Sequence, residues 1–315
     1  MNSENAVQEP PVWDASLSTM WARKNFATLS DFFVAARRLG FASIELNHHV
    51  DSTMLAGIDR SQVQFSSVHE PCPADISTET LKEQDWLISA EDDEKRWQGV
   101  QAVKRSIDLA NDLGAGTIVV HAGNVLADIT LEKKMRLLYK AKRKPTAEYH
   151  TLKDELQNMR AAQAELRLDA VKKSLIELLD YASRFDIRLG LENRYHYADI
   201  PVPDEMEMLL SLAGPDQLGF ICDVGHAQTL DQLGFYPLQE WLERFSTRIV
   251  GVHLHDVIGV DDHYAPGLGE IDFNKVAAFL PKEAFRTLEL QPKNTPEQIQ
   301  TGLMYLFEHN CIDPH

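Results

Sequence analysis

The chain has 315 residues, 44% of them hydrophobic, so it is long enough to form one large core. Its formal charge of −17 disfavours nucleic acid as a partner, because tight binding to duplex DNA draws on several Lys or Arg contacts with phosphates. No stretch approaches the roughly 20 apolar residues of a membrane-spanning helix, and the polar start lacks a secretion segment, so we expect a cytoplasmic protein with no membrane partner.

Short runs rich in Val, Ile and Leu recur along the chain, and each is followed by a segment with helical periodicity. The expected strands cover residues 17–20, 41–46, 63–69, 117–121, 188–192, 219–223, 249–255 and 287–290. The expected helices cover residues 29–39, 52–60, 95–113, 151–185, 204–212, 238–245, 273–280 and 296–308. Eight alternations of this kind predict an α/β fold, a (β/α)₈ or TIM barrel formed by residues 1–315 as one domain.

Two segments lie outside the repeating pattern. Residues 1–14 precede the first expected strand and form an N-terminal extension, while residues 125–168 are too long for an ordinary loop and predict a helical insertion after strand 4. Because the loops that follow barrel strands lie at the catalytic face, the insertion is expected to form a lid or an oligomer contact.

Polar residues stand at the ends of most expected strands. They are Glu45, His69, His121, Glu192, Asp223, the pair His253 and His255, and Glu289. In a closed parallel barrel all these ends meet at one mouth, where a divalent cation can satisfy several carboxylates and imidazoles at once.

Each of these residues also has a purely structural interpretation. A single His such as His69 or His121 can be a hydrogen-bonded core residue, and Glu45 can pair with an Arg. The three carboxylates Glu192, Asp223 and Glu289 are harder to explain in this way, because each ends an apolar strand where an unpaired charge is strongly destabilising. We therefore expect these three to bind a metal ion.

Five motifs along the chain support a family resemblance. They are Leu191-Glu192-Asn193, Asp223-Val224-Gly225-His226, Val252-His253-Leu254-His255-Asp256, the segment 261–273 and Leu288-Glu289-Leu290. In order and strand placement they resemble the xylose isomerase-like barrel superfamily, from about residue 17 to the C-terminus. That superfamily contains sugar 3-epimerases, inosose isomerases and dehydratases, hydroxypyruvate isomerases and the endonuclease IV type of apurinic-site nucleases (AP endonuclease family 2).

The resemblance implies an isomerase or epimerase that acts on a sugar, sugar phosphate or inosose and uses one divalent metal ion, Mn²⁺, Mg²⁺, Co²⁺ or Zn²⁺. It assigns the ion to Glu192, Asp223, His253 and Glu289; His255 is the alternative strand-7 ligand, and we favour His253 because it matches the inosose isomerase motif. Glu192 and Glu289 are the expected proton-transfer pair, acting through a metal-bound enediolate, and His226 is expected to assist them. The expected substrate contacts are Glu45, His69, His121, Asn193, Arg194, His226, His255 and His263.

Two other functions remain open. An endonuclease IV-like nuclease would hold three zinc ions with His69, His121, Glu192, Asp223, His226, His253, Asp261, His263 and Glu289, although the charge of −17 argues against it. A barrel that binds a sugar without turning it over is the other alternative. By resemblance, a homodimer or homotetramer is expected.

Overall fold

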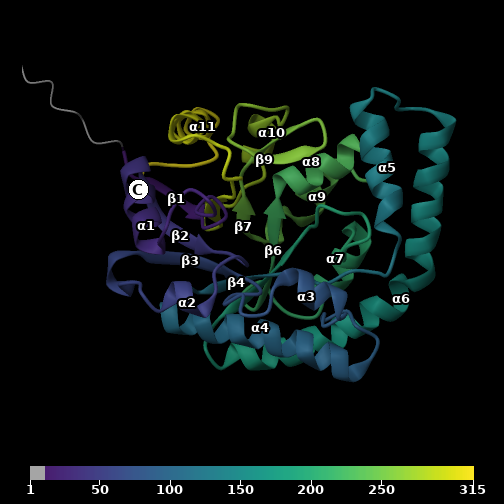
Figure 1. Ribbon diagram of the computed structural model, residues 1–315, viewed down its shortest axis with the longest axis horizontal. Helices are drawn as coiled ribbons and strands as arrows, with labels where there is room; N and C mark the ends of the chain where they lie inside the picture. Colours follow the sequence, from purple (N-terminus) through teal and green to yellow (C-terminus); the bar gives the residue numbers. More distant parts are fainter. Residues whose placement is uncertain (1–10) are drawn as a thin grey trace, which may run out of the picture.

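The computed structural model describes residues 11–315 and shows a closed barrel of parallel strands surrounded by helices (Figure 1). The barrel strands are β1 (Trp13–Ser18), β2 (Phe41–Leu46), β3 (Gln64–His69), β4 (Thr117–Val120), β5 (Arg188–Glu192), β6 (Leu218–Asp223), β7 (Ile249–His253) and β10 (Phe285–Leu288). They close in the order β1-β10-β7-β6-β5-β4-β3-β2. The predicted fold class, a (β/α)₈ barrel, is confirmed.

Strands β4, β6 and β7 are buried on both faces, which is why their sequences are largely apolar runs. Every residue of β4 and β6 is buried. Gly219 in β6 leaves room for its neighbour, because a Cβ atom there would lie 2.4 Å from a methyl group of Val250. The register pairs His253 with both Asp223 and Thr287, so the carboxyl ends of β6, β7 and β10 lie level with one another.

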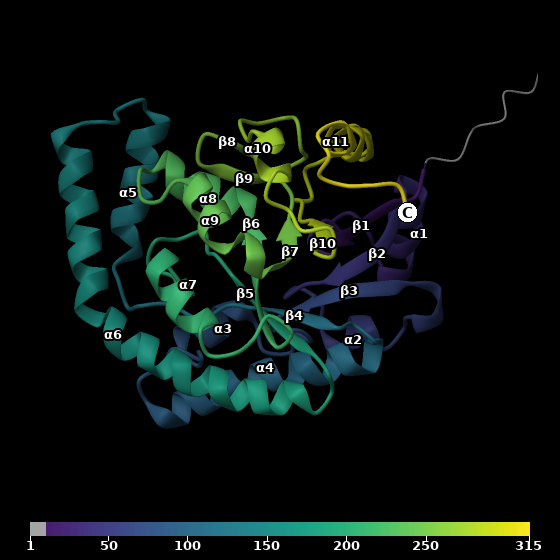
Figure 2. The same ribbon diagram turned by 180° about the vertical axis from the view of Figure 1, so that it is seen from behind.

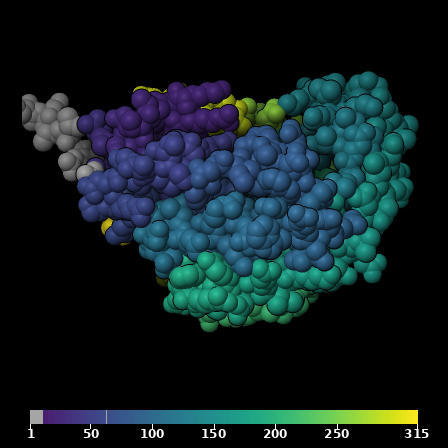
Figure 3. Space-filling view, turned by 60° about the horizontal axis from the view of Figure 1, so that its bottom comes forward, coloured from purple at the N-terminus to yellow at the C-terminus, as the bar shows by residue number. Residues whose placement is uncertain are grey.

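The helices lie outside the barrel and connect its strands along the chain. They are α1 (Leu29–Leu39), α2 (Ser52–Leu55), α3 (Thr78–Glu83), α4 (Asp93–Leu113), α5 (Ile129–Lys140), α6 (Ala147–Ser183), α7 (Pro203–Leu210), α8 (Val224–Gln232), α9 (Leu238–Phe245), α10 (Phe273–Ala277) and α11 (Pro296–Glu308), with two 3₁₀ turns, η1 (Arg60–Gln62) and η2 (Ser246–Arg248). Figure 3 shows α4 and α6 as adjacent bands on one outer face. Within residues 11–315, no helix combines the length and the apolarity needed to cross a membrane.

The helix ends follow the local sequence. The Thr28 side chain accepts a hydrogen bond from the backbone N–H of Asp31 and caps α1. Gly40 and Gly114 end α1 and α4 with φ angles of +97° and +70°, a conformation that glycine adopts without strain.

The insertion after β4 is a helical arm on one side of the barrel (Figures 1 and 2). It consists of α5 and the first part of α6, a helix of 37 residues whose later part packs on α4 and β5. The arm has its own small core, in which Met135, Tyr149 and Leu156 pack with Tyr197 and Leu233 from the barrel side. The arm is thus fixed to the barrel by a hydrophobic contact.

Several predicted boundaries differ from the structure. Strand β1 begins at Trp13, so the end of the predicted extension 1–14 belongs to the barrel, while residues 1–10 lie outside the described part. The predicted helix 52–60 is only the short α2, followed by η1, because Gly57 is a poor helix former. Helices α3 and α8 were not predicted.

The largest difference follows strand β7. The strand was predicted to run to residue 255 but ends at His253, and an antiparallel hairpin, β8 (Asp256–Ile258) and β9 (Asp261–Tyr264), follows it. The carboxylate of Asp256 causes the turn, since it accepts hydrogen bonds from the backbone N–H groups of Val257, Gly267, Gly269 and Ile271. This hairpin brings a further histidine, His263, to the barrel mouth.

Candidate metal centre

Four side chains from four neighbouring strands meet at the barrel mouth. They are Glu192 at the end of β5, Asp223 at the end of β6, His253 at the end of β7 and Glu289 directly after β10. One potential ligand atom of each lies within 4.8 Å of the others, and all four residues are buried. We call these residues the four-ligand cluster.

The spacing within the four-ligand cluster fits a single ion. The Nδ1 atom of His253 lies 2.8 Å from Glu192 Oε1, 3.3 Å from Glu289 Oε2 and 3.5 Å from Asp223 Oδ2. At a metal–ligand distance of about 2.1 Å, adjacent ligands of an octahedral or tetrahedral site lie about 3.0–3.4 Å apart. The measured separations correspond to the edges of such a polyhedron.

Hydrogen bonding within the described residues leaves this region unsatisfied. Six buried atoms have no hydrogen-bond partner there: Glu45 Oε1, His69 Nδ1, Glu192 Oε1, His253 Nδ1, His263 Nε2 and Glu289 Oε1. Buried polar atoms in native proteins are almost always paired, so such a concentration calls for a group that several of them share. A divalent cation fits, because its preferred ligands are these carboxylate oxygens and imidazole nitrogens.

His253 is oriented from behind by Glu45. The Glu45 carboxylate lies 3.2 Å from Nε2 of His253 and accepts the proton of that nitrogen, which leaves the Nδ1 lone pair directed at the four-ligand cluster. Glu45 also accepts a hydrogen bond from Ser67 and is fully buried, away from the residues that line the pocket. The predicted substrate contact of Glu45 does not fit this position.

The charges here are strongly coupled. Burial opposes ionisation of Glu45, but His253 outweighs it and lowers the pKa of that carboxyl to about 2. Burial likewise opposes protonation of His253, yet Glu45 and Glu289 raise its pKa well above the usual value. Without a cation, a protonated His253 therefore neutralises part of the negative charge of the surrounding carboxylates.

His255 orients Asp223 in a similar way. Its Nδ1 accepts the backbone N–H of His263, so its proton is on Nε2, which lies 2.9 Å from Asp223 Oδ1. Gly225 makes room for the ring, because a Cβ atom at that position would lie 2.0 Å from His255 Cε1. His255 is fully buried with both nitrogens engaged, which contradicts its predicted contact with substrate and favours His253 as the strand-7 ligand.

His226 and Asn193 were both expected to contact substrate, but only His226 lines the pocket. The amide of Asn193 is fully buried and bonds both the N–H and the carbonyl of Asp223, so it is a strut between β5 and β6 and not a substrate contact. The Nδ1 atom of His226 lies 3.0 Å from the Asn193 carbonyl, and the ring lines the pocket. Burial lowers the pKa of His226 to about 3, so its ring is neutral near pH 7.

Two further groups could hold a metal ion. One consists of His69, His121 and Glu192, in which the Nε2 atoms of the two histidines lie 2.6 Å apart. The other consists of Asp223, His226, His255 and His263. Asp261, expected as a zinc ligand in the nuclease interpretation, instead pairs with Lys140 at the surface, and its neighbour Asp262 lies 2.9 Å from His263 at the pocket.

A pocket of about 490 Å³ opens above the four-ligand cluster. Of the predicted site residues, it is lined by His69, His121, Arg194, His226, His263 and Glu289. Glu192 is fully buried beneath it, and the guanidinium of Arg194 donates to its carboxylate from the pocket side. Glu289 is therefore open to the pocket, whereas Glu192 lies behind Arg194.

The insertion holds one wall of this pocket. Glu132 of α5 is buried and accepts hydrogen bonds from Arg136 and from the backbone N–H of Tyr197, while it lies 2.9 Å from Nδ1 of His196. Arg136 in turn donates to the Tyr195 carbonyl and stacks on that ring at 3.9 Å. Both Tyr195 and His196 line the pocket, so α5 positions the loop that follows β5.

Several pocket residues were missed in the sequence. His48 and His49 lie two and three residues after the end of β2, beyond the strand-end positions that marked the other candidates, so the strand-end pattern did not find them. Arg23, Lys24, Lys82 and Asp262 also line the pocket. They lie in loops, a short helix and the unexpected hairpin, where the strand pattern gives no signal.

Fold and cluster together define a (β/α)₈-barrel protein with a buried centre of carboxylates and histidines at the carboxyl ends of its strands. The chain belongs to the xylose isomerase-like TIM barrel family, whose model matches residues 33–309. The family resemblance stated from the sequence is thereby confirmed. No curated protein matches the chain.

Solved structures share the fold at low sequence identity. A D-tagatose 3-epimerase-like protein is 19% identical with a TM-score of 0.64, over 93% of this chain and 96% of its own. The 3-keto-D-glucoside 4-epimerase YcjR from E. coli is 15% identical with a TM-score of 0.63, over 94% and 99%. The IOLI protein with a bound zinc atom is 13% identical with a TM-score of 0.62, over 94% and 97%. At these identities the likeness shows the fold.

Proposed function

We propose that this protein is a divalent-metal-dependent isomerase or epimerase of a sugar, sugar phosphate or cyclitol. The observation that carries the proposal is the four-ligand cluster, whose buried, unpaired atoms converge at the floor of an open pocket. Similar structures support it, since they include sugar epimerases and a zinc-bound barrel. A cytoplasmic location and a homodimer or homotetramer remain parts of this proposal.

The four-ligand cluster would hold the ion, Mn²⁺, Mg²⁺, Co²⁺ or Zn²⁺, with Nδ1 of His253 and the facing carboxylate oxygens as ligands. When bound, a divalent cation polarises a carbonyl group and acidifies the adjacent C–H bond. Glu45 would keep His253 in the orientation that ligation needs, because it bonds the side of the ring that faces away from the cluster centre, and His255 would hold the Asp223 carboxylate, whose two oxygens lie 2.9 and 3.1 Å from its Nε2.

Proton transfer is assigned to Glu192 and Glu289. Isomerisation and epimerisation both require one group to remove a proton from the carbon next to the carbonyl and a group to return one. Burial opposes ionisation of Glu289, but His253 outweighs it and lowers the pKa of Glu289 well below its usual value, so this carboxylate is available as a base. The neutral ring of His226, held by the Asn193 carbonyl, presents Nε2 to the substrate oxygens.

The test combines metal analysis with an exchange assay. Protein loaded with each of the four metals is incubated in D₂O with ketoses, ketose phosphates and inososes, and deuterium on the carbon next to the carbonyl is measured by NMR. We expect about one ion per chain and deuterium in at least one substrate. Bound metal without exchange in any substrate would instead support the third possibility, a barrel that binds sugars without turnover.

A nuclease with three zinc ions is the second candidate, because the two additional groups at the barrel mouth share Glu192 and Asp223 with the four-ligand cluster. The surface position of Asp261 and the charge of −17 weigh against it. Three tightly bound zinc ions together with cleavage of abasic-site DNA would establish the nuclease. One ion and intact DNA would eliminate it.

A further inference from the structure

Four cationic side chains, together with the carboxylates of Asp199, Asp262 and Glu289, line the pocket of this strongly acidic protein. Arg23, Lys24, Lys82 and Arg194 all line it, although the chain as a whole has a charge of −17. Within residues 11–315, no carboxylate forms an ion pair with Arg23, Lys24 or Lys82. Unpaired cations around a substrate pocket attract anions, and low-dielectric walls strengthen that attraction.

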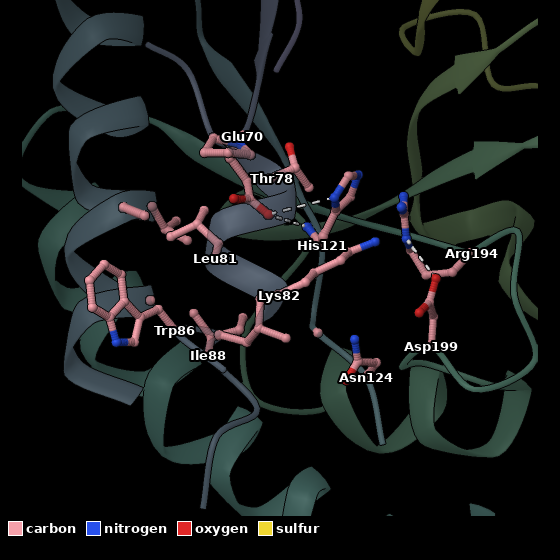
Figure 4. A pocket seen from close by; sticks show the side chains of 16 residues that line it. Glu70, Thr78, Leu81, Lys82, Trp86, Ile88, His121, Asn124, Arg194 and Asp199 are labelled. Atoms are coloured by element: carbon pink, nitrogen blue, oxygen red, sulfur yellow. Dashed lines mark hydrogen bonds and ion pairs between the residues drawn. The ribbon is translucent and has the colours of Figure 1, made fainter. Parts of the chain in front are cut away.

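Lys82 and Arg194 converge from different elements. Lys82 lies on α3, Arg194 lies in the loop after β5, and both side chains extend to the His121 ring (Figure 4). The same three residues line a second cavity of about 40 Å³ that adjoins the main pocket. Two cations therefore face one space beside the His121 ring.

The surroundings leave this pair of cations incompletely neutralised. The Nε atom of Arg194 is 3.8 Å from Asp199 Oδ2, beyond hydrogen-bonding distance, and its other carboxylate contact is Glu192 of the four-ligand cluster. Apolar side chains such as Leu81 and Trp86 line much of the small cavity, and the carboxylates of Glu70 and Asp199 also line it without an ion pair to Lys82. An anion at its mouth would thus be partly screened from water.

A second observation also indicates a ligand on this side of the pocket. His48 lines the main pocket with its ring 6.1 Å from that of His121, and its Nδ1 atom is buried without a hydrogen-bond partner among the described residues. Burial, followed by the positive charge of His69, lowers the pKa of His48, so the ring is neutral. It can bond a polar substrate group without competing for the negative charge.

We propose that the substrate carries a terminal anionic group, a carboxylate or a phosphate, which Lys82 and Arg194 bind while the carbonyl end faces the four-ligand cluster. Arg194 supplies a planar fork and Lys82 a point charge, a combination suited to either anion. This inference rests on the proposed function, since it specifies the substrate class of the same site. An anionic group bound to Arg194 would also compete with Glu192 for the guanidinium, so substrate binding would release the Glu192 carboxylate.

The first test measures binding without turnover. Inorganic phosphate is titrated calorimetrically into metal-stripped wild-type protein and into the Lys82→Met and Lys133→Met variants. Lys133 is an exposed residue of α5 outside the pocket, so Lys133→Met is the matched control for the loss of one charge. We expect phosphate to bind wild type and Lys133→Met equally and Lys82→Met about tenfold or more weakly, as for the loss of a charged hydrogen bond. Equal binding to all three proteins would overturn the proposal.

The second test uses the metal-loaded enzyme with a neutral ketohexose, its terminal phosphate ester and its terminal carboxylate analogue. We expect Lys82→Met to raise KM for the preferred anionic substrate about tenfold or more and to leave KM for the neutral ketose unchanged. The preferred anion distinguishes phosphate from carboxylate. An unchanged KM for both anions would refute the anion site while the isomerase proposal stands. Absence of exchange with every substrate would refute the isomerase, and the phosphate titration would still decide the anion site.

Discussion

Replacement of Glu45 by Gln tests whether His253 is held as a metal ligand. The glutamine carbonyl can still accept the proton of His253 Nε2, and the side chain keeps nearly the same volume next to Ser67. What disappears is the negative charge that polarises the imidazole and makes Nδ1 a stronger ligand. We therefore expect the fold to persist and the metal affinity to fall.

Changes to such hydrogen-bond partners of ligands weaken metal binding about 10–100-fold, which corresponds to about 1.4–2.8 kcal/mol. The assay is a competition titration of Mn²⁺ against a chelating dye, with wild-type and variant protein. Glu70→Gln is the matched control, because Glu70 is also a buried carboxyl at the barrel mouth but bonds the backbone of His121 and no residue of the four-ligand cluster. Equal Kd values for wild type and Glu45→Gln would refute the positioning role.

Three other predictions concern catalysis, metal removal and the insertion. Glu192→Gln and Glu289→Gln should each lower deuterium incorporation at least about 100-fold with an unchanged circular dichroism spectrum. A variant that exchanges deuterium at the wild-type rate would show that the replaced glutamate takes no part in proton transfer. Stripping the metal should lower the Tm, and restoring it at about 1,000 times its Kd should add about 4 kcal/mol of stability; an unchanged Tm would contradict a bound ion. Glu132→Ala should cost about 3–5 kcal/mol in urea unfolding, because the largely buried Arg136, 11% exposed, loses its carboxylate partner. Burial raises the pKa of Glu132, but His196 and Arg136 outweigh it and lower that pKa below 4.5, so its contribution is present above pH 4.5 and is lost as the pH falls through the lowered value. A variant with wild-type acid sensitivity would argue against the ion network.

The fold was predictable because its signals are local and repeated. Apolar runs such as 117–120 and 219–223 are buried on both faces, and caps such as Gly40 and Gly114 mark the helix ends. The hairpin after β7 was not predictable from alternation, because it depends on Asp256 bonding backbone groups up to fifteen residues away. Long-range hydrogen bonds of this kind leave no periodic signal.

The site was predictable at the level of strand ends and not at the level of atoms. The pattern indicated that Glu45 and His255 belong to the barrel mouth, which is correct, but their orientation behind His253 and Asp223 depends on packing between strands. Asn193 shows the same limit, since its place next to Glu192 suggested a substrate contact whereas its amide joins β5 to β6. Sequence position alone does not tell whether a residue near the four-ligand cluster faces the pocket or lies behind the cluster.

Anomalous X-ray diffraction from crystals grown with manganese tests the central claim most directly. The geometry predicts one strong manganese peak coordinated by Glu192, Asp223, Nδ1 of His253 and Glu289. Side chains of Glu192, Asp223 and Glu289 that turn away from one another, with no peak between them, would contradict a metal-dependent enzyme.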